Sequence, residues 1–504
     1  MDKEYWFGMK QKQFLKNIDT FYYSVFFNRD FTRETIHKEV LDLRQFCDEL
    51  KSQEDPANLY FKMGGCVYYQ PGSFSCYSIR LTSPDKFDFF LAPEIVNNKT
   101  PHAIVQLRSR TLWEDGVYNA VKESLEFVES FAKFFGMEIQ EIRENRCDFA
   151  CHSNYLANPE KFFSEQNFAK MWVGNVGRNY KDKTREMNCH ITVYDDDELE
   201  KDYIALGRRG DKCFIRIYLK SKEVVQQGYK GYFLQMWLLA GMISRYDMYC
   251  LEEGYKRRSW TYVETARLKW ALEYDDTLSE EDKEEIHKII DCEKPVFNDI
   301  RKAAKKYTRP VTKIHNIEFQ CMRDMSKSFE LIRKNDGPYA RVYDYLDNYD
   351  MIYEYLTRVC LRLVRTDSND SNKARREDTE FWTRLRNAKT VDFKKRHKDV
   401  ELIRKYNSNI NAELRKQRTL YALSSYGYAM TQDINADTFQ DVELLLSTLN
   451  DNDIMYVDRH KKKLDMRNSE CIPDDQKRKR CVSYYLYDPE TGEFYSGGKN
   501  RDYN

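Results

Sequence analysis

The sequence predicts an α+β protein in which a first half with a two-sheet or open-sheet arrangement is followed by a mainly helical second half. Up to about residue 260, short runs that alternate in polarity or carry β-branched and aromatic residues are separated by helical segments. Beyond that point, long charged segments repeat with helical periodicity. A chain of 504 residues is also too long for one ordinary core, so we expect two or three domains. The changes along the chain suggest the regions 1–260, 261–365 and 366–504.

The expected strands of the first region are short and rich in residues that suit a pleated, half-buried surface. Between them, one stretch from residue 112 to 135 has apolar residues near the 3.6-residue period of an amphipathic helix. The predicted strands are residues 20–27, 58–69, 75–82, 103–109, 146–152, 190–195, 212–220 and 244–252.

Helical patterns dominate the second half of the chain. The polar stretch 366–378 predicts a linker or an exposed loop, and residues 483–497 hold two alternating aromatic runs around a glycine-containing turn, which predicts a small hairpin. Basic clusters at 394–398, 459–463 and 477–480 fit either phosphate contacts or a solvated helical surface. The predicted helices are residues 261–273, 279–290, 297–306 and 325–333, with further helix from 380 to about 449.

The composition indicates a folded protein of a reducing compartment. Hydrophobic residues make up 41% of the chain and charged residues 33%, which is typical of a globular protein with a heavily charged surface. The 13 cysteines include no C-x-x-C pair, which argues against a disulfide framework and a zinc ribbon. The opening residues hold no signal-peptide core, and the longest apolar run, residues 232–243, is about half of the roughly 20 residues that a membrane span needs. We therefore expect a cytoplasmic protein without a membrane segment.

The hairpin pattern at residues 203–220 concentrates positive charge, although the whole chain is neutral. Between Leu206 and Lys220 there are five basic residues and one acidic residue, a local excess of four, whereas the full sequence balances 82 basic against 82 acidic residues. Such a run is either a solvated basic face or a surface that binds phosphate. The basic residues are Arg208, Arg209, Lys212, Arg216 and Lys220, and the acidic residue is Asp211.

Tyr218 stands among these cations on the second strand of the hairpin. Because strand side chains alternate between faces, Tyr218 shares a face with Arg216 and Lys220, while the opposite face is apolar. A phenol has a pKa of about 10, and adjacent positive charge favours the phenolate and would also hold a phosphate. Tyr218 is therefore either a nucleophile toward a phosphodiester or an aromatic residue that packs across strands.

Two other segments carry residues that suit a divalent metal ion. On a strand, Asp148 and His152 face the same way, and so do Arg245 and Asp247. Carboxylate and imidazole are ordinary ligands for Mn²⁺, and carboxylate suits Mg²⁺; such an ion stabilises charge on a phosphate under attack. A buried aspartate opposite an arginine is more often a structural ion pair, so both interpretations stay open.

Taken in order, three segments resemble a known family. The segments NRCDFA, YIALGRRGDKCFIRIYLK and SRYDMYCLEE resemble motifs of the rolling-circle replication initiators and relaxases of Gram-positive plasmids and integrative elements, the Rep_trans family. The resemblance covers about residues 19–259, with a weaker echo to residue 321, and implies an antiparallel, HUH-like nicking domain. Within the hairpin, the matching residues are Gly207, Arg209, Asp211, Lys212, Arg216, Ile217, Tyr218 and Lys220.

The resemblance assigns roles to the residues of the hairpin. Tyr218 matches the nucleophile that becomes attached to the 5′ phosphate of the nick. Arg216 and Arg209 match positions expected to contact the scissile phosphate. Further DNA contacts are implied for Arg208, Lys212, Lys220 and Arg245.

The resemblance also implies a site for Mg²⁺ or Mn²⁺. Asp148 matches a carboxylate of that site. His152 stands where the family usually has a second aspartate, and Asp247 stands where it usually has glutamate. Both replacements keep a group that can bind a metal ion, although the side chain of Asp247 is shorter.

The function that the resemblance implies is sequence-specific nicking and rejoining of one DNA strand through a 5′-phosphotyrosine, which initiates rolling-circle replication. A relaxase for conjugative mobilisation uses the same first step, and the departures at His152 and Asp247 leave open a non-catalytic DNA-binding protein that retains the fold. The implied partner is origin DNA, double- and single-stranded, with a host helicase and a second copy of the chain as further candidates. In this interpretation, residues 1–260 nick and join DNA, residues 261–365 form a helical DNA-binding continuation, and residues 366–504 form a basic, helical accessory domain.

Overall fold

The computed structural model divides the chain into two compact units. The first consists of Met1–Gln53, Leu59–Val400 and Tyr487–Phe494, and the second of Glu54–Asn58, Glu401–Leu486 and Tyr495–Asn504. The structure describes residues 3–8, 11–28, 68–69, 76–77, 79–83, 86–92, 100–156, 158–179, 181–193, 199–292, 296–326, 331, 335–388 and 390, and short pieces at 404–405, 419, 423, 445–449, 481–482, 485–487 and 494–496.

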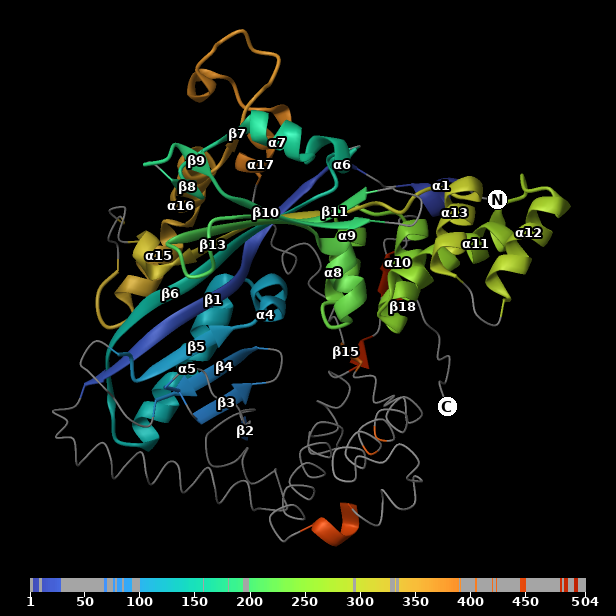
Figure 1. Cartoon of the computed structure of the whole chain (residues 1–504). Coiled ribbons are helices and arrows are strands. Elements are labelled where there is room, and N and C mark those ends of the chain that lie inside the picture. Colours follow the sequence, from blue (N-terminus) through green and yellow to red (C-terminus); the bar gives the residue numbers. More distant parts are fainter. Residues whose placement is uncertain are drawn as a thin grey trace. The chain divides into compact units, whose positions relative to one another are not determined.

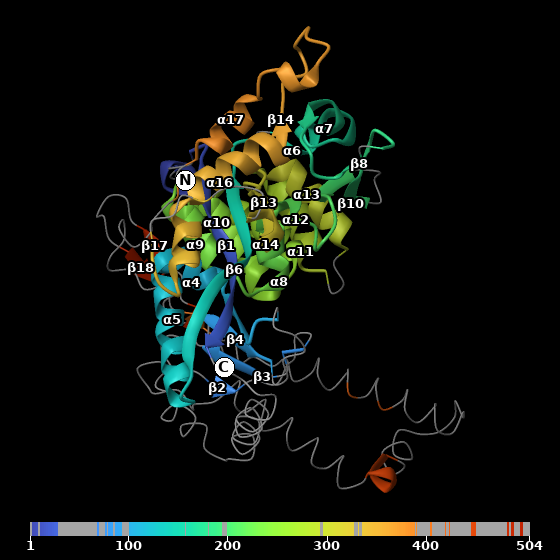
Figure 2. The same ribbon diagram turned by 90° about the vertical axis from the view of Figure 1, so that its left-hand side faces the viewer.

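A ten-stranded sheet runs through the first unit, with β1 and β6 as two long strands side by side (Figures 1 and 2). The strand order is β10-β11-β12-β13-β6-β1-β5-β4-β3-β2, and every neighbouring pair is antiparallel, as the resemblance implies. The strands are β1 (Phe14–Asn28), β2 (Tyr68–Tyr69), β3 (Ile79–Ser83), β4 (Phe87–Leu91), β5 (Ala103–Leu107), β6 (Glu138–Ser153), β10 (Met187–Val193), β11 (Leu199–Leu206), β12 (Cys213–Leu219) and β13 (His315–Met322).

Some helices pack on this sheet and others pack on one another, and short strands pair outside the sheet. The helices are α1 (Lys3–Phe7), α4 (Ser109–Glu114), α5 (Val117–Phe134), α6 (Pro159–Phe162), α7 (Glu165–Met171), α8 (Lys220–Gln227), α9 (Tyr232–Leu239), α10 (Arg245–Arg257), α11 (Trp260–Tyr274), α12 (Glu280–Ile290), α13 (Phe297–Tyr307), α14 (Arg323–Ser326), α15 (Ala340–Asp347), α16 (Tyr349–Tyr355), the π-helical turn Leu356–Cys360 and α17 (Glu380–Arg386). The small paired strands are β7 (Trp172–Val173) with β14 (Arg362–Leu363), β8 (Arg178–Asn179) with β9 (Thr184–Arg185), β15 (Arg404–Lys405) with β16 (Cys481–Val482), and β17 (Tyr485–Tyr487) with β18 (Phe494–Ser496).

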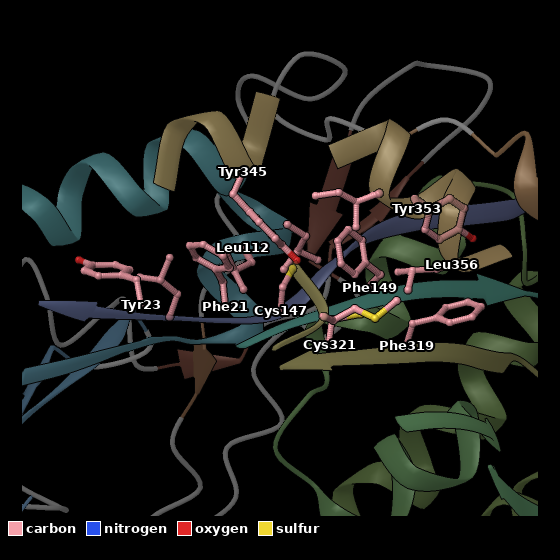
Figure 3. Packing of buried hydrophobic residues seen from close by; sticks show 14 of the residues in the cluster. Phe21, Tyr23, Leu112, Cys147, Phe149, Phe319, Cys321, Tyr345, Tyr353 and Leu356 are labelled. Carbon is pink, nitrogen blue, oxygen red and sulfur yellow. The ribbon is translucent and has the colours of Figure 1, made fainter. Parts of the chain in front are cut away.

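One face of the central strands is apolar and forms the core. Phe149 of β6 and Phe319 of β13 are fully buried on this face, because alternate residues of a strand point to the same side. The helices α15 and α16 cover it with Tyr345 and Tyr353 (Figure 3). The opposite face is therefore left to the polar residues of the same strands, Tyr218 among them.

The predicted hairpin is present, with Tyr203 of β11 opposite Tyr218 of β12. The predicted helix 112–135 is interrupted: α4 ends before Asp115, and α5 begins after Gly116, whose φ of 82° suits glycine and breaks the helical path. The predicted helices 261–273, 279–290 and 297–306 correspond to α11, α12 and α13, and the predicted C-terminal hairpin corresponds to β17 and β18.

The prediction of a strand at residues 244–252 is wrong, because α10 occupies this segment. Ser244 accepts a hydrogen bond from the backbone N–H of Asp247, and the Asp247 carboxylate accepts one from the backbone N–H of Ser244. This capping box satisfies two groups that would otherwise be unpaired at the start of a helix. The apolar residues Tyr246, Cys250 and Leu251 are then buried on one side of α10.

The predicted boundary at residue 260 falls inside one compact unit. Strand β13 comes from the region expected to be helical, yet it lies between β12 and β6 in the sheet. The predicted helix 325–333 overlaps only the end of α14, and residues 327–330 and 332–334 lie outside the described residues. The basic clusters at 394–398, 459–463 and 477–480 also lie outside them. Among the described helices, none has the length and the apolar character to cross a bilayer.

Candidate functional site

Three neighbouring strands bring the polar residues of the candidate site together. In register, Tyr218 of β12 lies opposite Asn316 of β13, and Asn316 lies opposite His152 of β6. One step along the same face, Arg216 lies opposite Glu318. Residues directly opposite each other in antiparallel strands have their Cβ atoms about 5 Å apart, so these side chains form one continuous polar surface.

The hydroxyl group of Tyr218 makes three hydrogen bonds on this surface. It donates to Glu318 Oε2 at 3.0 Å. It accepts from Lys220 Nζ at 3.2 Å and from Asn316 Nδ2 at 3.0 Å. A phenol has one donor and two acceptor positions, so its hydrogen-bonding capacity is filled and its orientation is fixed. The side chain of Tyr218 is partly buried.

The environment holds Tyr218 in its neutral form. Burial raises the pKa of Tyr218 well above its ordinary value, and the negative charge of Glu318 raises it further. The expectation that the neighbouring cations favour the phenolate is therefore wrong for this arrangement, because burial, together with the nearby carboxylates, outweighs them. A neutral phenol needs a proton acceptor before it can attack a phosphate, and the Glu318 carboxylate is the group to which its proton already points.

Lys220 is a fully buried cation at the start of α8. Its ammonium lies 2.7 Å from Glu223 Oε2 and 3.8 Å from Asp19 Oδ2. Burial alone would lower the pKa of Lys220, but the two carboxylates raise it above its ordinary value. A permanent positive charge therefore stands beside the oxygen of Tyr218.

Arg216 is the second cation of the site and is more accessible than Lys220. Its guanidinium pairs with the carboxylate of Glu318, whose side chain is 1% exposed, while the Arg216 side chain is 22% exposed. The guanidinium carbon also lies 5.6 Å from the centre of the Tyr218 ring. Of the two cations, Arg216 is the one placed to meet an anion that approaches from solvent.

Asp148, predicted as a metal ligand, is engaged by an arginine of its own strand. Arg146 donates hydrogen bonds of 2.9 and 2.5 Å to the two oxygens of the Asp148 carboxylate. Burial raises the pKa of Asp148 to about 6 in spite of this partner. The ion pair that the sequence left open as an alternative is the arrangement found.

His152 is fully buried and is oriented by aromatic residues. Its ring stacks on Trp113, with centroids 4.7 Å apart, and its Nδ1 accepts a hydrogen bond of 3.2 Å from Trp237 Nε1. Burial lowers the pKa of His152 well below its ordinary value, so the ring is neutral, and because an indole N–H can only donate, its proton is on Nε2. A metal ion at Nε2 would move this proton to Nδ1, where it would face the Trp237 donor.

The carboxylate of Asp247 accepts hydrogen bonds from the backbone N–H groups of Ser244 and Thr312. Besides closing the capping box with Ser244, it accepts hydrogen bonds of 2.7 Å from both the backbone N–H and the hydroxyl of Thr312. Among the described residues, no group of three or more His, Cys, Asp or Glu side chains is arranged to hold a metal ion. Of the predicted ligands, Asp148 forms an ion pair, His152 packs in an aromatic cluster and Asp247 caps a helix. Their arrangement therefore does not fit a shared Mg²⁺ or Mn²⁺.

The other predicted DNA contacts lie apart from the Tyr218 hydroxyl. Arg208, Arg209 and Lys212 are exposed in the turn between β11 and β12, at the opposite end of β12 from Tyr218. Arg245 begins α10, and its guanidinium lies 4.1 Å from the centre of the Tyr5 ring. The predicted neighbours that the structure brings to Tyr218 are Arg216 and Lys220.

Sequence reasoning missed Glu318 and Asn316. Both lie in the segment HNIEFQCM, in which Asn316, Glu318 and Gln320 alternate with apolar residues. That alternation is the signal of a strand with one polar face, and it could have predicted β13.

Comparisons with known proteins give little beyond this geometry. No family model matches the chain, and no curated protein matches it. Among solved structures, the chain is similar to a rolling-circle replication initiator protein from Geobacillus stearothermophilus. The identity is 9%, the alignment covers 75% of this chain and 99% of that chain, and the TM-score is 0.35.

Proposed function

We propose that the protein is a DNA nicking and joining transesterase of the kind that initiates rolling-circle replication, with Tyr218 as its nucleophile. The observation that supports this most is the hydrogen bonding of one oxygen atom. The Tyr218 hydroxyl donates to the Glu318 carboxylate at 3.0 Å and accepts from the Lys220 ammonium at 3.2 Å. A tyrosine nucleophile requires a group that accepts the proton of its hydroxyl and a cation that stabilises the negative charge on its oxygen. Both groups contact the hydroxyl of Tyr218.

The chemical step follows from these contacts. As the Tyr218 oxygen forms a bond to phosphorus, its proton passes to Glu318, and the bond between phosphorus and the 3′ oxygen of the neighbouring nucleotide breaks. The 3′ oxygen takes up a proton from solvent, and the 5′ phosphate stays on the tyrosine. Because one phosphodiester replaces another, the free 3′ hydroxyl can later reverse the reaction without ATP.

The two cations have different tasks in this step. Lys220 is buried and reaches the phenol oxygen, so it stabilises negative charge on that oxygen as the proton leaves. Arg216 is partly exposed beside it, so it is the group for an oxygen of the phosphate, to which a guanidinium can donate two hydrogen bonds. Contacts of Arg209 with the scissile phosphate stay a prediction.

Replication and conjugative mobilisation both begin with the same nicking step and use the free 3′ hydroxyl that it leaves. The proposed chemistry therefore applies equally to a relaxase. The need for Mg²⁺ or Mn²⁺, which the resemblance implies, stays a prediction, and calorimetric titration of the protein with Mn²⁺ tests it. Origin DNA, a host helicase and a second copy of the chain stay predictions as partners.

The test uses a supercoiled plasmid that carries the DNA flanking the gene for this chain. Tyr218→Phe removes only the hydroxyl, so it should abolish nicking and leave binding of the same DNA unchanged, since the aromatic ring and both cations remain. Nicking by Tyr218→Phe at the wild-type rate would overturn the assignment.

A second candidate is a DNA-binding protein that retains the fold without catalysis. The observation in its favour is that the cations around Tyr218 are paired with carboxylates: Lys220 with Asp19 and Glu223, and Arg216 with Glu318. Such pairing reduces the positive charge offered to a phosphate. Binding of the flanking DNA without any nicking by the wild-type protein would favour this candidate.

A further inference from the structure

A buried carboxylate from the first strand lies behind the cation that contacts Tyr218. Asp19 belongs to β1, and its residue exposure is 4%. Its Oδ2 lies 3.8 Å from Lys220 Nζ and accepts a hydrogen bond of 3.4 Å from Lys230 Nζ. Burial alone would raise the pKa of Asp19, but the two ammonium groups lower it far below its ordinary value. Asp19 is therefore a permanent anion between two lysines.

The backbone of β1 is irregular at this residue. Ile18 lies opposite Phe149 and Thr20 lies opposite Asp148, so Asp19 is an extra residue without a partner in the register of β1 and β6. Such a bulge changes the direction of a side chain, and bulges are frequent beside active sites. Because of the bulge, the carboxylate of Asp19 points in a direction that it would not have if β1 paired regularly with β6.

Two further hydrogen bonds hold Asp19 against helix α4, and a third joins α4 to its neighbour α9. Its Oδ1 accepts hydrogen bonds from Trp113 Nε1 at 3.0 Å and from Ser109 Oγ at 2.5 Å. The hydroxyl of Tyr232 donates to the same Ser109 Oγ at 2.6 Å. The carboxylate is thus held directly by α4, whose Ser109 is itself fixed by α9, and it has little freedom to move.

We propose that Asp19 is a positioning residue for the nucleophile: it holds the ammonium of Lys220 against the hydroxyl of Tyr218. The inference rests on the proposed function, because the ammonium matters most when negative charge develops on the tyrosine oxygen. Asp19 does not touch Tyr218 in this scheme and acts only through Lys220.

The second carboxylate paired with Lys220, that of Glu223, restricts the position of the ammonium less than Asp19 does. Glu223 belongs to the same helix as Lys220, three residues further on, and its side chain is 21% exposed, against 6% for Asp19. Of the two carboxylates paired with Lys220, Asp19 is therefore the one that ties the ammonium to the sheet that carries Tyr218. The groups that face Lys220 are Asp19 from β1, His152 from β6, Tyr218 from β12, Glu318 from β13, Glu223 from α8, Lys230 from the segment before α9 and Phe233 from α9.

The first arm of the test measures nicking. Asp19→Asn keeps the shape of the side chain and removes its charge, so Glu223 is left as the carboxylate that pairs with Lys220. The rate of a single turnover should fall about 10- to 100-fold, and the affinity for the DNA should not change. Asp19→Glu, which keeps the charge, should recover part of the rate.

The second arm does not depend on nicking. With 3-fluorotyrosine in place of Tyr218, the ¹⁹F resonance reports the surroundings of the hydroxyl. Lys220→Met should shift this resonance, and Asp19→Asn should shift it in the same direction. Asp344→Asn is the control, because Asp344 is also a buried aspartate but belongs to α15 on the opposite face of the sheet.

The inference fails if Lys220→Met moves the resonance and Asp19→Asn leaves it at the wild-type position, or if Lys220→Met does not move it. If Asp19→Asn does not fold, Ser109→Ala removes one hydrogen bond to Asp19 and no charge, and it should give the same change at smaller amplitude; no change would overturn the inference. A wild-type protein that never nicks DNA defeats the proposed function, while the ¹⁹F result still decides whether Asp19 positions Lys220.

Discussion

Replacing Glu318 by glutamine tests whether Glu318 accepts the proton of Tyr218, because it changes one carboxylate oxygen to an amide nitrogen. Glutamine has the same shape and keeps an oxygen that can accept the hydrogen bond of the Tyr218 hydroxyl, but it cannot take the proton. Since general base catalysis contributes about 10²- to 10⁴-fold, Glu318→Gln should slow nicking by a factor in that range. The affinity for DNA should not fall, because the carboxylate that neutralises Arg216 is removed.

The same change has a calculable cost in stability. Removing one partner of a buried ion pair costs about 3–5 kcal/mol when the other charge stays buried. The Arg216 side chain is 22% exposed and regains part of its hydration, so the free energy of unfolding of Glu318→Gln should fall by about 2 kcal/mol. Urea denaturation followed by circular dichroism measures this loss.

Glu144→Gln is the matched control for both measurements. Glu144 is a buried glutamate of β6 that pairs with Arg341, whose side chain is 34% exposed. Its replacement should cost a similar free energy of unfolding and leave nicking by the folded protein unchanged. Wild-type nicking by Glu318→Gln, or equal losses of nicking in the two variants, would refute the role of Glu318 as proton acceptor.

Three further predictions concern stability. Asp247→Ala should lower the free energy of unfolding by about 2–4 kcal/mol in urea titrations, because it removes a helix cap and leaves the N–H of Thr312 unpaired; an unchanged midpoint would contradict this. Burial lowers the pKa of His315 to about 4, so the unfolded chain binds a proton below pH 6.5 that the folded protein does not take up until about pH 4. Stability should therefore fall as the pH drops through this window, by up to about 1.4 kcal/mol per pH unit for this residue, and His315→Gln should lose that part of the slope in urea titrations at pH 6.5 and 4.5. Phe149→Ala, which empties a fully buried site, should cost about 3–5 kcal/mol, and a loss below 1 kcal/mol would show that Phe149 is not a core residue.

The hairpin that carries Tyr218 was predictable because its signal is local. In β12 the apolar residues Ile215 and Ile217 alternate with Arg216 and Tyr218, and a period of two is the signature of a half-buried strand. The structure places the two isoleucines in the core and the other two on the polar face.

The segment at residues 244–252 was ambiguous for a physical reason. Tyr246, Met248 and Cys250 alternate as in a strand, while Tyr246, Cys250 and Leu251 also fit one side of a helix. The pattern of apolar residues cannot separate the two structures over so few residues. The capping box of Ser244 and Asp247 favours the helix. Its signal is present in the sequence as a serine followed three residues later by an aspartate.

The partners that Tyr218 finds on other strands could not be assigned to it from sequence. Glu318 is 100 residues away along the chain, and its position opposite Arg216 depends on the register between β12 and β13. The position of Asp19 depends on a bulge in β1, which no local pattern announces. Contacts of this kind are set by the packing of the whole sheet and not by neighbouring residues.

The most direct measurement is the mass of the peptide that contains Tyr218 after the protein has been incubated with single strands from the DNA that flanks its gene. If Tyr218 is the nucleophile, protease digestion followed by nuclease treatment should leave this peptide with the added mass of a 5′-linked nucleotide, and Tyr218→Phe should give no such peptide. Cleaved DNA with an unmodified Tyr218 peptide, or a nucleotide attached to another residue, would contradict the central claim.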